Sequence, residues 1–200
     1  MKRLDLQCSE HPNFIGGWHL DDSDLCQGLI DFFDSNRSMQ KVGSSGTGHE
    51  SAIKKTTDIS IEPKDFDKPD YAIFRTYMDR LFECHSDYLL QWPFLGSIMP
   101  ELDIGRFNLQ KYEPGGHFGS VHTERASLSN LHRVLAFMTY LNDVDDGGLT
   151  RFEHYGVSVR PEAGKTLIWP AEWTHAHSGE VVNSGTKYIV TGWMQFPLKA

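Results

Sequence analysis

The sequence predicts a mainly β protein, a sandwich or jelly roll, with supporting α-helices in its N-terminal half. Beyond Pro100, short segments rich in β-branched and aromatic residues alternate with turn residues, a pattern typical of many-stranded sandwiches and jelly rolls. Before Pro100, apolar residues recur at helical spacing instead. The sequence shows neither repeats nor a linker. We therefore expect one domain over residues 1–200, with 1–100 as a helical support region and 101–200 as the β-core.

Two helices are expected in the first half. The polar run around Asp22 offers N-cap candidates ahead of apolar residues at helical spacing, and this helix should end near Ser35. Pro69 opens the second helix, because proline at the first turn loses no hydrogen bond. An apolar stripe follows along that helix, which we interpret as the face packed on the sheet: Ile73, Phe74, Tyr77, Met78, Leu81 and Tyr88.

Strands are expected from β-branched content and flanking turns. Residues 1–20 should form an irregular lead-in or a short edge strand, and a strand is expected over 53–61. The Gly- and Ser-rich segment 43–48 is typical of a surface loop, with a lid over an active site as the alternative. In the second half, the strand-like segments are 107–112, 133–141, 156–160, 166–169 and 187–196.

Composition limits the function classes. The net charge of −8 disfavours nucleic-acid binding, which would require a basic face. No run of 18 apolar residues is present, so a membrane-spanning helix is not expected, and the N-terminus lacks the apolar run of a signal peptide. The three cysteines lack a Cys-x-x-Cys pair and are interpreted as reduced thiols of a cytoplasmic protein. The oligomeric state is left open.

Three side chains have the chemistry of a ferrous site. His122 and Glu124 form a His-x-Glu pair, and on a strand two such positions point to the same side, about 7 Å apart. A distant histidine would complete a set of two imidazoles and one carboxylate, which holds Fe(II) on one face and leaves positions open. By strand parity alone, either His175 or His177 could be that third ligand.

The region 103–196 resembles the 2-oxoglutarate- and Fe(II)-dependent oxygenases, specifically their prolyl 4-hydroxylase-like branch. The resemblance is carried by Tyr112-Glu-Pro-Gly115, by His122, and by His177 with Lys187 ten residues later. Two features depart from the family pattern. Glu124 stands where the family usually has Asp, although bacteriophage-encoded members are similar here. Three residues rather than two separate Phe118 from His122, which predicts a bulge or a shifted register.

The resemblance implies a double-stranded β-helix, a cupin-like jelly roll whose mouth holds the iron. It implies His122, Glu124 and His177 as metal ligands and catalytic residues, with His175 left as a neighbour of the site. It also implies Fe(II), 2-oxoglutarate and O₂ as cofactor and co-substrates, with ascorbate as a further candidate. Lys187 is expected to bind the far carboxylate of 2-oxoglutarate. Tyr112, Tyr140 and Thr191 are further candidates for the co-substrate pocket.

The implied reaction is hydroxylation of an unactivated C–H bond, coupled to decarboxylation of 2-oxoglutarate to succinate. A prolyl residue in a peptide or protein is the expected substrate. A free amino acid or another small molecule is the alternative within the same chemistry, and a nucleic-acid demethylase is disfavoured by the acidic charge. A cupin-like metal-binding or interaction protein without turnover is the alternative of another class, motivated by Glu124 and the altered spacing before His122.

Overall fold

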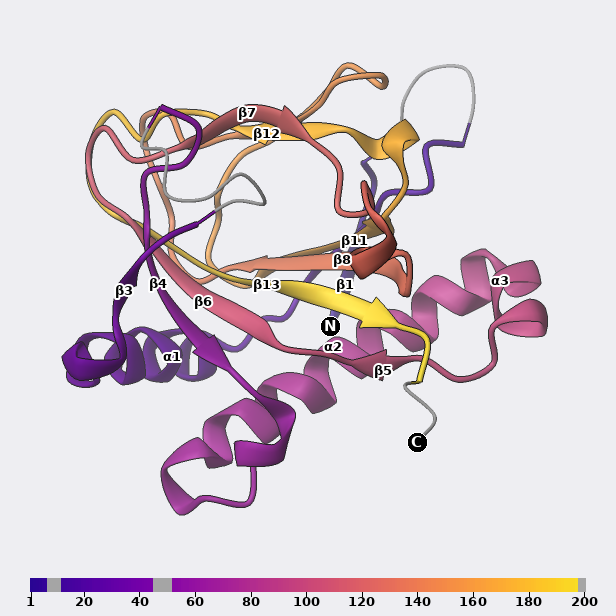
Figure 1. The fold of residues 1–200 in the computed structure, drawn as a ribbon, viewed down its shortest axis with the longest axis horizontal. Helices are drawn as coiled ribbons and strands as arrows, with labels where there is room; N and C mark the ends of the chain where they lie inside the picture. Colours follow the sequence, from indigo (N-terminus) through magenta and orange to yellow (C-terminus); the bar gives the residue numbers. More distant parts are fainter. Residues whose placement is uncertain (7–11, 45–51, 198–200) are drawn as a thin grey trace.

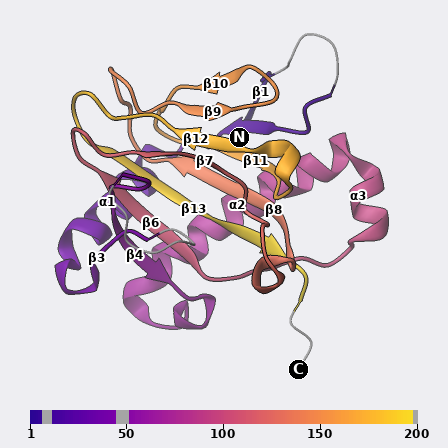
Figure 2. The same ribbon diagram turned by 45° about the horizontal axis from the view of Figure 1, so that its top comes forward.

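Two antiparallel β-sheets lie face to face in the computed structural model, which describes residues 1–6, 12–44 and 52–197 (Figure 1). The larger sheet has the order β1-β2-β11-β8-β13-β6-β4-β3, with β5 paired to β13. The smaller sheet has the order β10-β9-β12-β7 and lies over β8, β11 and β13 (Figure 2). The predicted mainly β jelly roll is confirmed.

The larger sheet consists of β1 (Lys2–Leu4), β2 (Gly16–His19), β3 (Lys41–Val42), β4 (Thr57–Ile61), β5 (Asp103–Ile104), β6 (Phe107–Tyr112), β8 (Arg133–Tyr140), β11 (Lys165–Pro170) and β13 (Lys187–Gln195). The smaller sheet consists of β7 (Phe118–His122), β9 (Thr150–Phe152), β10 (Val157–Val159) and β12 (His177–Gly179). Strands β6, β8, β10, β11 and β13 match the predicted segments to within a residue or two. The strand expected over 53–61 begins only at Thr57.

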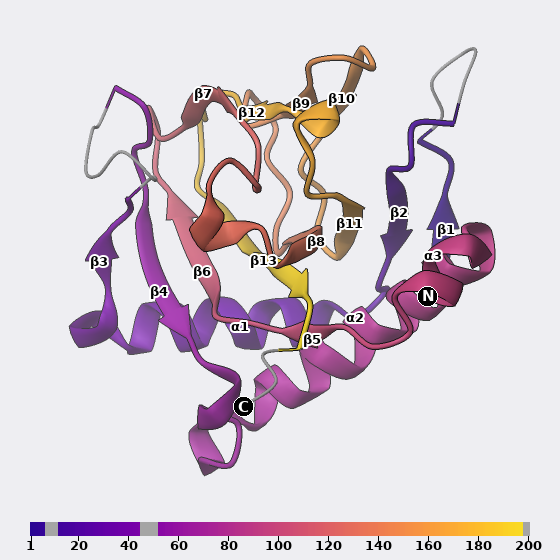
Figure 3. The same ribbon diagram turned by 45° about the vertical axis from the view of Figure 1, so that its right-hand side comes forward.

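The helices support the larger sheet on the side away from the smaller one (Figure 3). Helix α1 (Ser23–Ser35) begins as predicted, with Asp22 Oδ1 accepting a hydrogen bond from Leu25 N at 3.1 Å. Helix α2 (Ala72–Gln91) follows a 3₁₀ turn that Pro69 opens. The predicted stripe on α2 is buried apart from Ile73, which is partly exposed. A short third helix, α3 (Pro93–Ile98), was not predicted.

Two hydrophobic clusters fill the molecule. The first packs α1 and α2 against the outer face of the larger sheet. The second lies between the two sheets and includes Tyr112, Tyr140, Phe152, Trp169 and Ile189. Because side chains alternate between the faces of a strand, β13 contributes to both clusters: Val190 and Met194 to the first, Ile189 and the partly buried Trp193 to the second. The space between the sheets is therefore where a site can form.

The N-terminal half is more than a helical support, since it also supplies β1–β4 to the larger sheet. Of the segment 43–48, residues 45–48 lie outside the described ranges, so the loop and lid interpretations both stay predictions.

Cys26 and Cys84 are free, buried thiols, and burial raises their pKa to about 11 and about 12. Cys8 lies outside the described residues. Among the described helices, none has the length and apolar character to cross a membrane.

Candidate metal centre and co-substrate pocket

The two histidines of the predicted triad meet across neighbouring strands. Strand β7 ends at His122 and β12 begins at His177, and these two residues are register partners. Phe152 on β9 is the next partner of His177 in the same row. All three side chains lie on the inner face of the smaller sheet, since Phe152 packs in the cluster between the sheets and its ring contacts that of His177.

A row of the larger sheet faces these residues. Trp169 on β11 and Trp193 on β13 are both register partners of Ala136 on β8, so two indoles flank one small side chain. The Trp169 ring packs edge-on against His177, with ring centroids 5.1 Å apart. Trp193 reaches across to the carboxylate of Glu124. The metal centre is thus enclosed between the two sheets at the end where β13 finishes.

Glu124 completes the triad from the bend that follows β7. The candidate ligand atoms of His122, Glu124 and His177 all lie within 4.8 Å of one another. Glu124 Oε1 is 3.2 Å from His177 Nε2 and 3.8 Å from His122 Nε2. The sequence argument placed His122 and Glu124 on one strand. That part was wrong, because β7 ends at His122 and the bend turns the carboxylate toward both imidazoles.

Backbone carbonyls fix both imidazole rings. Nδ1 of His122 lies 2.8 Å from the carbonyl oxygen of Ser120, and Nδ1 of His177 lies 2.9 Å from that of His175. A carbonyl only accepts, so each Nδ1 carries the proton in these bonds and each Nε2 keeps its lone pair. Such bonds orient metal-binding histidines and set their tautomer. The two free lone pairs therefore face the same carboxylate oxygen.

Glu124 is held on its other side by the larger sheet. Nε1 of Trp193 donates to Oε2 at 2.7 Å. Arg133 donates to the backbone carbonyl of Glu124 at 2.9 Å, and its guanidinium lies 3.4 Å from the centroid of the Trp193 ring. Trp193 therefore packs on the core between the sheets and also donates a hydrogen bond to a candidate metal ligand. A tryptophan six residues beyond Lys187 on one strand face was the available signal, but nothing in the sequence places Glu124 opposite it.

The ionisation of the site suits a divalent cation. Burial, together with the neighbouring His177 ring, lowers the pKa of His122 to about 4. Burial alone would raise the pKa of Glu124, but His177 Nε2 at 3.2 Å and the positive charge that either histidine carries when protonated outweigh burial and lower that pKa to about 2. At neutral pH, His122 is neutral and Glu124 is ionised, the forms that bind a metal.

His175 is excluded as the third ligand in this arrangement. It lies in a 3₁₀ turn rather than on a strand, so the parity argument that kept it open does not apply. Its Nε2 is 2.8 Å from the carbonyl oxygen of Asn13, and its Nδ1 is 3.0 Å from the hydroxyl of Thr174. Its own carbonyl orients His177, so it touches the site through its backbone.

The predicted irregularity before His122 is present. The pairing of β7 with β12 shifts register between His177 and Gly179, whose partners are His122 and Phe118. The irregularity brings Phe118 into parallel stacking on the His122 ring, with centroids 3.8 Å apart and an interplanar angle of 14°. The irregular pairing thus leaves His122 opposite His177, with Phe118 packed on its ring.

Lys187 is a buried cation between the sheets. It is 2% exposed, and its Nζ donates to the carbonyl oxygen of Gly148 at 3.0 Å. Its ammonium lies 4.2 Å from the centroid of the Tyr112 ring, its register partner on β6. Among the described residues, no carboxylate lies within ion-pair distance of it. Burial lowers its pKa to about 8. A buried ammonium without an anion is costly, so the site fits an anionic ligand.

The hydroxyl groups of the other candidate pocket residues, Tyr112, Tyr140 and Thr191, each donate a hydrogen bond within the protein. The hydroxyl of Tyr112 donates to Gln110 at 2.8 Å, and that of Tyr140 donates to Thr150 at 2.6 Å. Thr191 lies on the same strand face as Lys187 and donates to the carbonyl oxygen of Phe137 at 3.1 Å. Contacts of these three with a co-substrate stay predictions. Trp169 Nε1 is buried without a hydrogen-bond partner in the described residues, so a donor is available beside His177.

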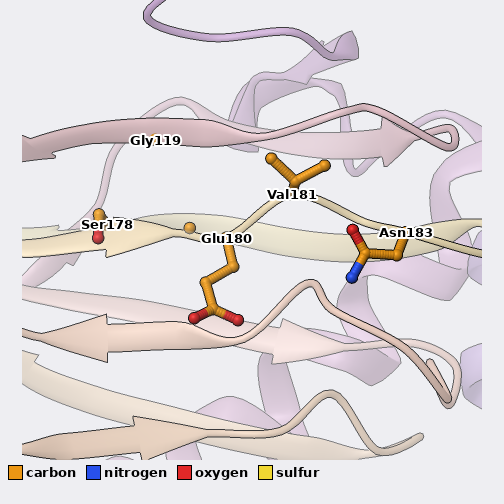
Figure 4. Close-up of a pocket in the computed structure, with 6 residues that line it drawn as sticks. Gly119, Ser178, Glu180, Val181 and Asn183 are labelled. Carbon is orange, nitrogen blue, oxygen red and sulfur yellow. The ribbon is translucent and has the colours of Figure 1, made fainter.

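An open depression of about 390 Å³ lies over β7 and β12 (Figure 4). Its lining residues are Gly119, Ser178, Gly179, Glu180, Val181 and Asn183. Ser178 follows His177 along β12, and successive strand residues point to opposite faces. This depression is therefore on the outer face of the smaller sheet, away from the triad, and we do not assign the chemistry to it.

Known proteins match the part of the chain that holds the candidate site. Residues 107–195 match the family model of the 2OG-Fe(II) oxygenase superfamily, and this range holds the triad and Lys187. The chain is similar to this superfamily over these residues. Over 108 residues the chain is 27% identical to prolyl 4-hydroxylase subunit alpha-1 of Gallus gallus, covering 49% of this chain and 21% of that protein. Over 125 residues it is 23% identical to probable prolyl 4-hydroxylase 9 of Arabidopsis thaliana, covering 50% and 43%. The chain thus spans less than half the length of these relatives.

Solved structures share the fold over almost the whole chain. A prolyl-4-hydroxylase of Pseudomonas putida superposes with a TM-score of 0.69 at 19% identity, covering 92% of this chain and 94% of that chain. The viral collagen prolyl hydroxylase of Paramecium bursaria Chlorella virus-1, in its 2OG complex, gives a TM-score of 0.66 at 14% identity, covering 92% and 96%. The expected double-stranded β-helix is confirmed by this likeness.

The residues of this chain fit the cofactor and co-substrate that the family uses. Two nitrogen donors with free lone pairs and one carboxylate oxygen converge on one point, the donor set of non-haem Fe(II) sites with open positions. Beyond them, the buried ammonium of Lys187 fits the distal carboxylate of a dicarboxylic keto acid. Fe(II), 2-oxoglutarate and O₂ suit this arrangement.

Proposed function

We propose that this protein hydroxylates a prolyl residue in a peptide or protein, with Fe(II), 2-oxoglutarate and O₂. The observation that carries the proposal is a metal-binding triad and a buried cation on facing sheets. Three ligand atoms lie within 4.8 Å of one another, and the buried ammonium of Lys187, which has no ion pair among the described residues, lies at the start of β13. The metal would bind the keto-acid end of 2-oxoglutarate, and Lys187 would bind its far carboxylate.

Bound Fe(II) would supply the oxidising chemistry with O₂ as the oxidant: one oxygen atom would enter the substrate C–H bond, and the other would enter the succinate formed as 2-oxoglutarate loses CO₂. The roles of the chain are positioning and shielding. His122, Glu124 and His177 would hold the metal on one face, and Lys187 would hold the distal carboxylate. Trp169, Phe152 and Ile189 pack between the sheets and keep bulk water from the site.

A peptide substrate is favoured over a small molecule by the relatives. The curated proteins that match are prolyl 4-hydroxylases. A prolyl hydroxylase of Trichoplax adhaerens has been solved with a hypoxia inducible factor peptide fragment, and this protein superposes on it with a TM-score of 0.69 at 14% identity, over 92% of this chain and 84% of that chain. These relatives support a prolyl peptide as the first substrate to test.

The direct test is a screen of proline-containing peptides and free amino acids with the Fe(II)-loaded enzyme. Succinate formation and the mass gain of one oxygen atom are measured together. We expect both with a peptide and neither with the Lys187→Met variant. Oxygen transfer to free proline, and to no peptide, would support the small-molecule alternative instead.

The metal-binding protein without turnover is the competing function. Two features suggested this alternative: the side chain of Glu124 is one methylene longer than the usual Asp, and the spacing before His122 is irregular. Glu124 Oε1 faces both imidazoles, and the bulge stacks Phe118 on His122, so neither departure distorts the triad. Absence of succinate under every condition, with metal bound, would favour this alternative.

A further inference from the structure

A chain of buried contacts runs behind the site and begins on β4, outside the range matched by the family model. At its centre is Asp58, whose side chain is 12% exposed. Its Oδ2 accepts from Lys54 Nζ at 2.7 Å and from Gln110 Nε2 at 3.0 Å. Its Oδ1 accepts from Thr56 Oγ1 at 2.7 Å. Asp58 therefore anchors two long side chains that lead in different directions.

One direction leads to the metal. The Lys54 side chain is 5% exposed, and its ammonium lies 5.5 Å from the centroid of the Phe118 ring. This is cation–π distance. The same Phe118 ring stacks on His122 at 3.8 Å. Lys54 thus restrains Phe118, which contacts the first metal ligand, and Asp58 restrains Lys54.

The other direction leads to the co-substrate lysine. Gln110, fixed by Asp58, accepts from the hydroxyl of Tyr112 at 2.8 Å. The Tyr112 ring lies under the ammonium of Lys187 at 4.2 Å. The register of β4, β6 and β13 supports this route, because Asp58 pairs with Gln110 and Lys187 pairs with Tyr112.

We propose that Asp58 is a positioning residue that sets both halves of the site, the first metal ligand through Lys54 and Phe118, and the co-substrate lysine through Gln110 and Tyr112. The inference rests on the proposed function only in taking the triad as a metal site and Lys187 as a 2-oxoglutarate contact. Buried polar networks of this kind restrict side chains to one arrangement when every member is bonded.

The two branches can be tested separately by measuring ligand binding, without measuring turnover. Mn(II) affinity of the metal-free protein reports on the His122 branch, and 2-oxoglutarate affinity at saturating Mn(II) reports on the Lys187 branch. Lys54→Met is expected to weaken Mn(II) binding about tenfold, the scale of lost outer-shell support, and to leave 2-oxoglutarate affinity unchanged. Gln110→Leu is expected to do the reverse, with a several-fold loss for 2-oxoglutarate. Asp58→Asn is expected to weaken both.

Ser60→Ala is the matched control. Ser60 is also on β4 and also bonds a β6 side chain, Asn108 at 2.8 Å, but this contact is exposed. Neither affinity should change in it. Circular dichroism and thermal unfolding of each variant separate misfolding from loss of positioning.

The proposal is overturned if Asp58→Asn is folded and binds both ligands as the wild type does. It is also overturned if Lys54→Met and Gln110→Leu each reduce both affinities equally, because that pattern indicates general destabilisation. These results do not depend on the substrate. A failure to hydroxylate peptides would therefore leave the inference standing, and its own failure would leave the proposed reaction untouched.

Discussion

Trp193 Nε1 donates a 2.7 Å hydrogen bond to Oε2 of Glu124, and this bond joins the end of β13 to the bend after β7. It leaves Oε1 of the same carboxylate directed at the imidazoles, 3.2 Å from His177 Nε2. A glutamate has one more rotatable bond than an aspartate, so it loses more conformational freedom when it is fixed. The hydrogen bond from the Trp193 indole restricts the Glu124 side chain before a metal binds.

Trp193→Phe should therefore weaken metal binding. The ring volume is largely kept while the donor is lost, and loss of an outer-shell partner typically costs about 10- to 100-fold in metal affinity. Mn(II) or Co(II) titration of the metal-free variant measures the effect. Trp173→Phe is the control, because Trp173 is 68% exposed and should give wild-type affinity. Wild-type affinity in Trp193→Phe would show that the bond does not orient the ligand.

Lys187→Met should abolish 2-oxoglutarate binding, keep Mn(II) binding and stabilise the ligand-free fold. The pKa of Lys187 is lowered to about 8 because burial disfavours its charge. A shift of this size corresponds to roughly 3 kcal/mol, and the lost bond to Gly148 offsets about 1 kcal/mol of it. We expect the free energy of unfolding to rise by about 2 kcal/mol in urea titrations. A less stable variant would indicate that the ammonium contributes to the fold.

The affinity for 2-oxoglutarate should fall in alkaline solution. The co-substrate needs the protonated Lys187, whose pKa in the free protein is about 8. Affinity should be nearly constant from pH 6.5 to 8 and then decline by about tenfold per pH unit, until the raised pKa of the bound state is reached. Calorimetry at saturating Mn(II) measures this dependence. An affinity that is flat to pH 9.5 would place the distal carboxylate elsewhere.

Removing the imidazole of His175 should reduce stability more than it weakens metal binding. His175→Ala loses the contacts with Asn13 and Thr174 but keeps the carbonyl that orients His177. We expect a lower midpoint of thermal unfolding and metal affinity within a few-fold of the wild type. A complete loss of metal binding in a folded His175→Ala protein would reopen the choice of third ligand.

Much of the fold could be predicted from local patterns. The Asp22 cap and the α2 stripe were read correctly, because both depend on contacts within a few residues. The choice of His177 as ligand came from the family resemblance, in which Lys187 follows ten residues later in the sequence. Strand β9 and helix α3 were missed, since three and six residues leave too little periodicity to recognise.

The contacts that support the site could not be predicted. Trp193 and Glu124 are 69 residues apart, and Lys54 precedes β4 whereas Phe118 begins β7 of the smaller sheet, so no sequence spacing relates them. The register shift in β7 was predicted, but its consequence, the stacking of Phe118 on His122, depends on the tertiary fold. Cytoplasmic localisation and a need for ascorbate stay predictions.

The most direct measurement is the visible charge-transfer absorption of the protein mixed anaerobically with Fe(II) and 2-oxoglutarate. The account predicts a band in the wild type and in His175→Ala, and no band in His122→Ala or His177→Ala. A band that survives in both His122→Ala and His177→Ala would contradict the assignment of these three side chains to a single ferrous ion.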